Sequence, residues 1–168
     1  SVKIAGGVGK GRLRIWHHVG KKWNGKVASE VYSGPLLAAL KRCSPHKRRY
    51  SLIEDNDPSG FKSKRGEAAK RAAKIKILCL PKRSPDLSVM DYAIWKNVTQ
   101  LMRQQEKRFP KSKRETRAAF IERLRRTAKG LPSSFINKAT GNTKERCERL
   151  FQAKGHHFEE GGKSLFVR

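Results

Sequence analysis

The order of short apolar segments is the feature that most constrains how this chain can fold. Segments 2–5 and 12–19 flank the glycine-rich stretch GGVGKG and predict a β-hairpin. Further strands are predicted at 50–54 and 75–80, with an alanine-rich helix at 63–74 between them. The order strand, strand, helix, strand, helix, strand, then helices predicts an α/β fold in which helices pack on a mixed sheet of paired strands.

Helices are predicted before, between and after these strands. The Asn-Gly pair at 24–25 predicts a turn, and apolar residues then recur at helical spacing from Ala28 to Lys41. Ser29 is the expected N-cap of this helix, and Pro35 is expected to disturb it locally. The remaining helices are predicted at about 90–107, 115–129 and 133–153, the last interrupted near Gly141. Residues 1–168 are expected to form one domain.

The chain has a large excess of positive charge. It contains 40 Lys and Arg residues against 14 Asp and Glu residues, which gives a formal net charge of +26. Self-repulsion at this charge opposes compact folding, and a polyanion relieves it, so nucleic acid is the expected partner. An acidic protein or an anionic membrane surface is the alternative. However, no apolar run is long enough to span a membrane, and no helix combines a broad apolar face with a clean basic one.

Basic residues are concentrated in four runs, at 41–49, 63–74, 103–114 and 123–129. Any one of these runs is equally consistent with a solvated helix face, but four of them on a small domain favour phosphate contacts. The candidate nucleic-acid-binding residues are Lys41, Arg42, Lys47, Arg48, Arg49, Lys64, Arg65, Lys70, Arg71, Lys82, Arg83, Lys111, Lys113, Arg114, Arg123, Arg125 and Arg126. Their pattern does not distinguish DNA from RNA.

The three cysteines do not form a recognisable metal or disulfide pattern. Cys43, Cys79 and Cys147 are odd in number and include no CxxC pair. This pattern argues against a disulfide framework and against a closed zinc site. The sequence therefore predicts a reducing, intracellular environment, either a nucleus or an organelle.

Acidic residues are concentrated directly after a predicted strand. Glu54, Asp55 and Asp57 lie within IEDNDPSG, and Asp55 is expected at the strand's C-terminal end, where ligand sites gather in α/β sheets. Asp86 and Asp91 follow the next strand. Two converging carboxylates can hold divalent cations, and a pair of such ions clamps the attacking and leaving oxygens of phosphoryl transfer. Turn and capping roles for Asp57 and Asp86 are the alternative.

The two acidic segments resemble the catalytic core of mariner-type transposases of the DDE/DDD superfamily, which has an RNase H-like fold. IEDNDPSG is similar to the family's second catalytic motif, and SPDLSVMDY is similar to its third. Asp55 and Asp91, 36 positions apart, match the second and third catalytic carboxylates. The segments GGVGKGRLRIW and RCERLFQAKGHHFEE match the family's hairpin and C-terminal helix more weakly.

The resemblance implies a site at Asp55 and Asp91 for Mg²⁺ or Mn²⁺, but the family pattern is incomplete. Val89 stands where the family has a proline, and Gly60 stands where it has a histidine. No residue matches the first catalytic aspartate, which lies on a strand before the hairpin in the family. The chain therefore resembles the C-terminal two-thirds of the catalytic core, and two carboxylates are expected to bind metal weakly.

Three functions follow as hypotheses. In the first, the chain is a nucleic-acid-binding protein of transposase descent, catalytically incomplete and used as a structural component of a nucleoprotein assembly such as an organellar ribosome. In the second, it is a catalytic-domain fragment of an active mariner-type transposase that performs Mg²⁺-dependent DNA cleavage and strand transfer. In the third, it is a basic interaction domain for an acidic protein or a membrane.

Overall fold

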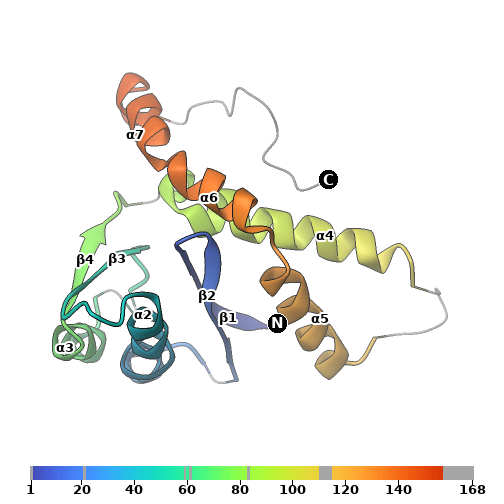
Figure 1. Cartoon of the computed structure of the whole chain (residues 1–168), viewed down its shortest axis with the longest axis horizontal. Coiled ribbons are helices and arrows are strands. Elements are labelled where there is room, and N and C mark those ends of the chain that lie inside the picture. Colours follow the sequence, from blue (N-terminus) through green and yellow to red (C-terminus); the bar gives the residue numbers. More distant parts are fainter. Residues whose placement is uncertain are drawn as a thin grey trace.

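The computed structural model describes residues 2–20, 22–58, 60, 62–82, 84–109 and 115–156. Two small sheets lie among helices that cover them on several sides, and Figure 1 shows this mixed α/β arrangement. The predicted fold class is confirmed. No helix in the described part of the chain is long and apolar enough to cross a membrane.

The first sheet is the predicted hairpin. Strand β1 (Lys3–Gly9) pairs antiparallel with β2 (Arg12–Val19). The turn is made by Lys10 and Gly11, whose φ angles are 48° and 68°. Residues Lys10 and Gly11 therefore occupy the left-handed region that two-residue hairpin turns require.

Strand β1 is longer than predicted because its glycines belong to the strand and not to the turn. A Cβ atom on Gly6 would lie 2.8 Å from Met90 Cε and 3.0 Å from Trp95 Cη2. Because Gly6 has no side chain, β1 can pack closely against the helical segment that contains Met90 and Trp95.

The second sheet consists of two parallel strands. Strand β3 (Tyr50–Glu54) pairs with β4 (Ile75–Cys79), and helix α3 (Lys64–Ala72) connects them. The prediction that all four strands pair in one sheet is wrong, because the described strands form two separate two-stranded sheets. Apolar patterning identifies which segments are extended, whereas strand partners depend on contacts between distant segments.

A nearly continuous helix runs from residue 25 to residue 43. It consists of α1 (Gly25–Val31), the π-helical turn η1 (Tyr32–Leu36) and α2 (Leu37–Cys43). Pro35 lies inside η1, as predicted. Because proline has no N–H to donate, the regular hydrogen-bond ladder is interrupted there and widens locally.

The start of this helix differs from the prediction. Asn24 is the N-cap, and its Oδ1 accepts hydrogen bonds from the backbone N–H groups of Lys26 (3.0 Å) and Val27 (3.1 Å). Ser29 lies inside the helix and donates back to the carbonyl of Lys26. The predicted Asn-Gly turn is thus the start of the helix itself, because asparagine suits both a turn and an N-cap.

The remaining helices form the other half of the molecule. The short 3₁₀ turn η2 (Pro85–Leu87) leads into η3 (Met90–Trp95) and α4 (Lys96–Glu106), followed by α5 (Arg117–Lys129), α6 (Ser133–Gly141) and α7 (Thr143–Gln152). The predicted interruption near Gly141 is confirmed, since it separates α6 from α7. Figure 1 shows α4 and α6 on the side of the hairpin away from α3.

Two hydrophobic clusters stabilise the two halves. One is centred on Ile94, Val98 and Ile136, which are at most 1% exposed, and joins η3, α4 and α6. The other contains Tyr50 and Ile75, the first residues of the parallel strands, packed against α1, η1 and α2. The acidic segments 54–57 and 86–91 come from these different halves, so packing of the halves determines how their carboxylates are placed.

Candidate metal and nucleic-acid site

Asp55 and Asp91 lie at the ends of elements from the two halves. Asp55 follows the last residue of β3, and Asp91 lies in the first turn of η3. Both side chains are exposed. Loss of hydration and the negative charges of Asp57, Glu54 and Asp91 raise the pKa of Asp55 above its ordinary value. The Asp91 carboxylate is therefore close enough to Asp55 to repel its charge.

Asn56 joins the segments that follow the two parallel strands. Its Nδ2 donates to the carbonyl of Leu80 at 2.7 Å and to that of Pro81 at 3.2 Å. This pair of bonds ties the loop after β3 to the loop after β4. Asp55 is thereby held next to the segment that leads to Asp91.

The segment before Asp91 is attached to the C-terminal helices. Arg146 of α7 donates from Nε to the carbonyl of Asp86, and its guanidinium lies 3.9 Å from the centre of the Tyr92 ring. The Tyr92 hydroxyl donates to the carbonyl of Ala139 at 2.5 Å. These contacts fix the start of η3, and with it the backbone at Asp91.

Asp57 has a structural role at the turn after β3. Its Oδ2 accepts from Trp23 Nε1 at 2.6 Å and from the backbone N–H of Gly60 at 2.7 Å. The alternative interpretation of Asp57 as a turn residue is therefore supported, because the bond to Gly60 closes the turn. The bond from Trp23 was not predicted from the sequence, since 34 positions separate the two residues.

Glu54, the last residue of β3, is held by residues of η1 and α3. It accepts from the Tyr32 hydroxyl and pairs with Lys70 Nζ at 2.8 Å, and the Lys70 ammonium lies 4.7 Å from the centre of the Tyr32 ring. The side chains of Lys70 and Glu54 are 5% and 12% exposed. Burial and the hydrogen bond to Glu54 raise the pKa of Tyr32, so Tyr32 stays a hydrogen-bond donor.

Gly60 has no room for a side chain. A Cβ atom there would lie 2.4 Å from Tyr32 Oη and 3.3 Å from Asp57 Oδ2. The histidine that the transposase pattern has at this position therefore does not fit this packing. The carbonyl of Gly60 also lies 3.5 Å from Lys70 Nζ. Tyr32, Glu54, Asp57, Gly60 and Lys70 are hereafter called the support network.

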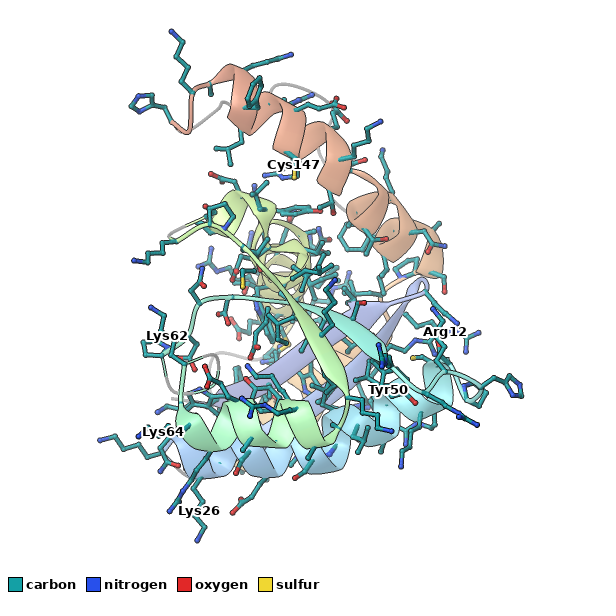
Figure 2. The ribbon with its side chains drawn as sticks, turned by 90° about the vertical axis from the view of Figure 1, so that its left-hand side faces the viewer. Arg12, Lys26, Tyr50, Lys62, Lys64 and Cys147 are labelled. Carbon is teal, nitrogen blue, oxygen red and sulfur yellow. The ribbon has the colours of Figure 1, made fainter. Side chains whose placement is uncertain are left out.

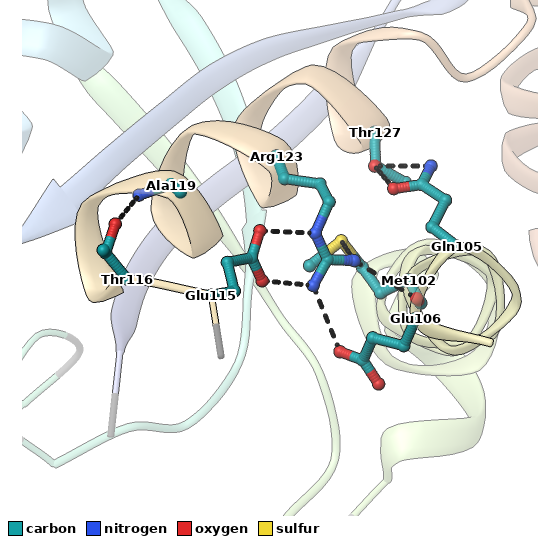
Figure 3. A network of polar contacts seen from close by, with 8 residues as sticks. All are labelled: Met102, Gln105, Glu106, Glu115, Thr116, Ala119, Arg123 and Thr127. Carbon is teal, nitrogen blue, oxygen red and sulfur yellow. Dashed lines mark hydrogen bonds and ion pairs between the residues drawn. The ribbon is translucent and has the colours of Figure 1, made fainter. Parts of the chain in front are cut away.

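Two of the predicted phosphate-contacting residues are buried and paired with carboxylates. Lys70 is 4% exposed and is occupied by Glu54, and Arg123 is 9% exposed. Figure 3 shows Arg123 joining α4 to α5, with its Nη2 2.6 Å from Glu115 Oε2 and 3.2 Å from Glu106 Oε1. A basic run in the sequence does not reveal which of its cations is buried, because burial depends on where distant carboxylates lie in the fold.

The other predicted cations vary in accessibility. Arg125 is half-buried and bonds Glu122 at 2.6 Å, and Arg126 lies 3.8 Å from the same carboxylate. Arg83, Lys111, Lys113 and Arg114 lie outside the described residues. The exposed ones are Lys41, Arg42, Lys47, Arg48, Arg49, Lys64, Arg65, Arg71, Lys82 and Arg126.

The arrangement at Asp55 and Asp91 suits a cation but is not a complete cage. The charges of Asp57, Glu54 and Asp91 repel the charge of Asp55, and a bound divalent ion would offset this repulsion. Glu54 and Asp57 are engaged by Lys70, Tyr32 and Trp23. Among the described residues, no group of three or more His, Cys, Asp or Glu side chains is placed to hold a metal ion.

Comparison with solved structures identifies the fold. The crystal structure of the catalytic domain of Mos1 mariner transposase matches with a TM-score of 0.77 and 16% sequence identity, over 94% of this chain and 76% of that chain. This chain shares the RNase H-like fold of that domain. No protein-family model matches the sequence, and a search of curated proteins gives no significant match.

Longer Mos1 structures match over less of their own length. A Mos1 paired-end complex with the left transposon end has a TM-score of 0.74 and 17% identity, over 89% of this chain and 42% of that chain. The Mos1 strand transfer complex has a TM-score of 0.63 and 18% identity, over 89% of this chain and 42% of that chain. The chain thus spans less than half the length of the transposase chains in these complexes. The predicted resemblance to a mariner-type catalytic core is confirmed at the level of the fold.

Proposed function

We propose that this chain binds DNA by charge and holds one divalent cation at a partial transposase metal site formed by Asp55 and Asp91. The observation that most supports this proposal is that Asp55 follows the end of β3 and Asp91 lies at the start of η3, where the charge of Asp91 adds to burial and to the charges of Asp57 and Glu54 in raising the pKa of Asp55. A bound Mg²⁺ or Mn²⁺ would neutralise them and polarise a phosphate oxygen. Solved Mos1 catalytic domains with Mn and with Mg, and Mos1 complexes with a transposon end, support both parts of the proposal.

The residues around the site favour binding over cleavage. Two-ion phosphoryl transfer needs enough ligands to orient both ions, and among the described residues no group of three or more possible ligands is placed to hold a metal ion. Glu54 and Asp57 would have to break their bonds to Lys70 and Trp23 to help. We therefore propose that the chain alone binds DNA without cutting it and contributes to a nucleoprotein assembly. The similar structures support neither a ribosomal role nor RNA binding.

Exposed cations near the ends of β3 and β4 would contact the DNA at this site. Lys62 and Lys64 precede and begin α3, and Lys82 follows β4. Each Lys or Arg that neutralises a phosphate releases a counterion. The logarithm of the binding constant should therefore fall with the logarithm of salt concentration, by about 0.9 per phosphate on duplex DNA. Salt-insensitive binding would instead favour an acidic protein partner.

An active transposase fragment is the second candidate. It is favoured by the same observation, since the charge of Asp91 is among the causes of the raised pKa of Asp55. In that case a third carboxylate comes from further residues of a longer polypeptide or from a partner chain. The enzyme would then cleave and join DNA only when that carboxylate is supplied.

A cleavage assay separates the two candidates. The chain is incubated with end-labelled duplex DNA and Mn²⁺, next to an Asp55→Ala, Asp91→Ala double variant. We expect no strand cleavage by either protein, and equal or tighter DNA binding by the variant because it has lost two negative charges. Cleavage by the parent that disappears in the variant would overturn the binding-only proposal and establish the transposase fragment.

A further inference from the structure

One face of helix α7 presents apolar side chains to the outside of the molecule. Phe151 is 85% exposed, more than any other large hydrophobic residue of the described chain, and Cys147, one turn earlier, is also exposed. A hollow of about 450 Å³ lies along this face, and its described lining consists of Lys144, Cys147, Glu148, Phe151 and Gln152. Figure 1 shows α7 at the upper edge of the molecule, beyond α6.

The other face of α7 attaches this helix to the rest of the fold. Arg146 is buried there, where it donates to the carbonyl of Asp86 and lies over the Tyr92 ring. A helix turns by about 100° per residue, so Phe151 lies on the side of α7 away from Arg146. The packing of α7 on η2 and η3 therefore leaves the face at Cys147 and Phe151 for a further segment.

The chain turns sharply directly after this face. The backbone N–H of Gly155 donates to the carbonyl of Leu150, and that of Lys154 donates to the carbonyl of Phe151, each at 3.0 Å. Lys154 and Gly155 have φ angles of 52° and 83°. These bonds and angles form a Schellman motif, which ends a helix and turns the chain. The residues after Gly155 therefore do not continue along the axis of α7. Figure 2 labels Cys147 on this helix.

The sequence that follows this turn contains an apolar segment within reach of the hollow. Residues 157–168, which lie outside the described part of the chain, read HFEEGGKSLFVR. The pair Gly161–Gly162 is a turn signal, and the consecutive apolar residues 165–167 follow it. The nine residues from 156 to 165 can span at most about 30 Å, whereas Phe151 lies only roughly 10 Å back along the helix.

We propose that residues 165–167 dock into the hollow at Cys147 and Phe151, so that the C-terminal tail covers the outer face of α7. Two arguments favour the chain's own tail over a second copy. A short linker keeps a tethered segment at an effective concentration of about millimolar, and the net charge of +26 makes two copies repel one another. The docked tail would stabilise the helix that holds the start of η3 through Arg146. This inference does not depend on the proposed DNA or metal binding.

Alkylation of the native cysteines tests this inference with the full chain. The reduced protein reacts with iodoacetamide, and peptide mass spectrometry gives a separate rate for Cys43, Cys79 and Cys147. Cys79, which is exposed at the end of β4, is the internal reference. The tail variant is Leu165→Ser, Phe166→Ser, Val167→Ser. The control, Lys163→Ser, Arg168→Ser, changes the same tail but keeps its apolar residues.

We expect the tail variant to raise the Cys147 rate at least about fivefold, because protection follows the fraction of time that the face is covered. The Cys79 rate, and both rates in the control, should stay within about twofold of the parent. An unchanged Cys147 rate in the tail variant would overturn the inference, including the case in which protection rises with protein concentration and a second copy covers the face. A parallel rise at all three cysteines would also overturn it, because the variant would then have loosened the whole fold.

A crosslinking variant tests the same contact by its position. In Phe166→Cys, mild oxidation should join position 166 to Cys147 within one chain, because the docked segment holds the two thiols close together. Equal crosslinking to Cys79, or products that chiefly join two chains, would contradict docking of the tail on α7.

Discussion

The two ends of the parallel strand pair use charge in opposite ways. At the carboxyl end, Glu54 and Asp57 are bound by Lys70, Tyr32 and Trp23, whereas Asp55 and Asp91 are exposed. At the other end, Lys47, Arg48 and Arg49 precede β3 and are exposed, and none of them forms an ion pair with a carboxylate within the described part of the chain. Buried, paired charges stabilise a geometry, whereas exposed, unpaired charges attract a partner at little cost in stability. Substitutions at the two ends should therefore be separable by what they change.

Loss of the buried cation at the carboxyl end should have the largest effect. Lys70→Met leaves the Glu54 carboxylate buried without its partner and should lower the free energy of unfolding by about 3–5 kcal/mol. Urea denaturation measures this. Lys64→Met, an exposed position on the same helix, is the control and should change stability by less than about 0.5 kcal/mol. Equal stabilities of the two variants would show that the Lys70–Glu54 pair does not hold the site.

Gly60 should give the next largest effect. In Gly60→Ala the new Cβ meets Tyr32 Oη and displaces the support network, which should cost about 1–3 kcal/mol. Gly34→Ala is the matched control, because a Cβ there meets nothing within 4 Å and the residue lies in a helical segment. Alanine at Gly34 should leave stability unchanged or raise it by up to about 1 kcal/mol. Thermal melts that rank the variants in the reverse order contradict the packing at Gly60.

Asp55→Asn should have the smallest effect, and it should stabilise the folded chain where Lys70→Met and Gly60→Ala destabilise it. The raised pKa of Asp55 means that the folded chain prefers the protonated carboxyl, so the parent loses stability as pH rises through that pKa. In metal-free buffer the variant should be more stable at pH 7, by roughly 0.5 kcal/mol or less because the side chain is exposed. The gain should vanish below the ordinary aspartate pKa, near about pH 3. Denaturation at both pH values tests this, and a variant less stable at pH 7 contradicts it.

The sequence predicted most of the elements of the fold. The strands at 12–19 and 50–54 and the helix break near Gly141 depend on local patterning, which the chain encodes directly. Asp55 and Asp91 were matched through motif resemblance. Only the folded chain shows that the charge of Asp91 contributes to the raised pKa of Asp55.

The support network and the separation of the two sheets could not be predicted in this way. Trp23 and Asp57 are 34 positions apart, and Tyr32 lay within an ordinary apolar helix stripe. Lys70 and Arg123 looked like their exposed neighbours in sequence, and only distant carboxylates turn them inward. Which cation is buried depends on tertiary contacts, and local sequence propensity carries no information about these.

Mn²⁺ binding by isothermal titration calorimetry tests the shared metal site most directly. The parent, Asp55→Asn, Asp91→Asn and the double variant are compared at one pH and salt concentration. If both carboxylates hold one ion, each single variant should lose at least about tenfold in affinity, and the double variant should lose far less than the sum of the two losses. Mn²⁺ binding that is unchanged by Asp91→Asn would contradict a shared site.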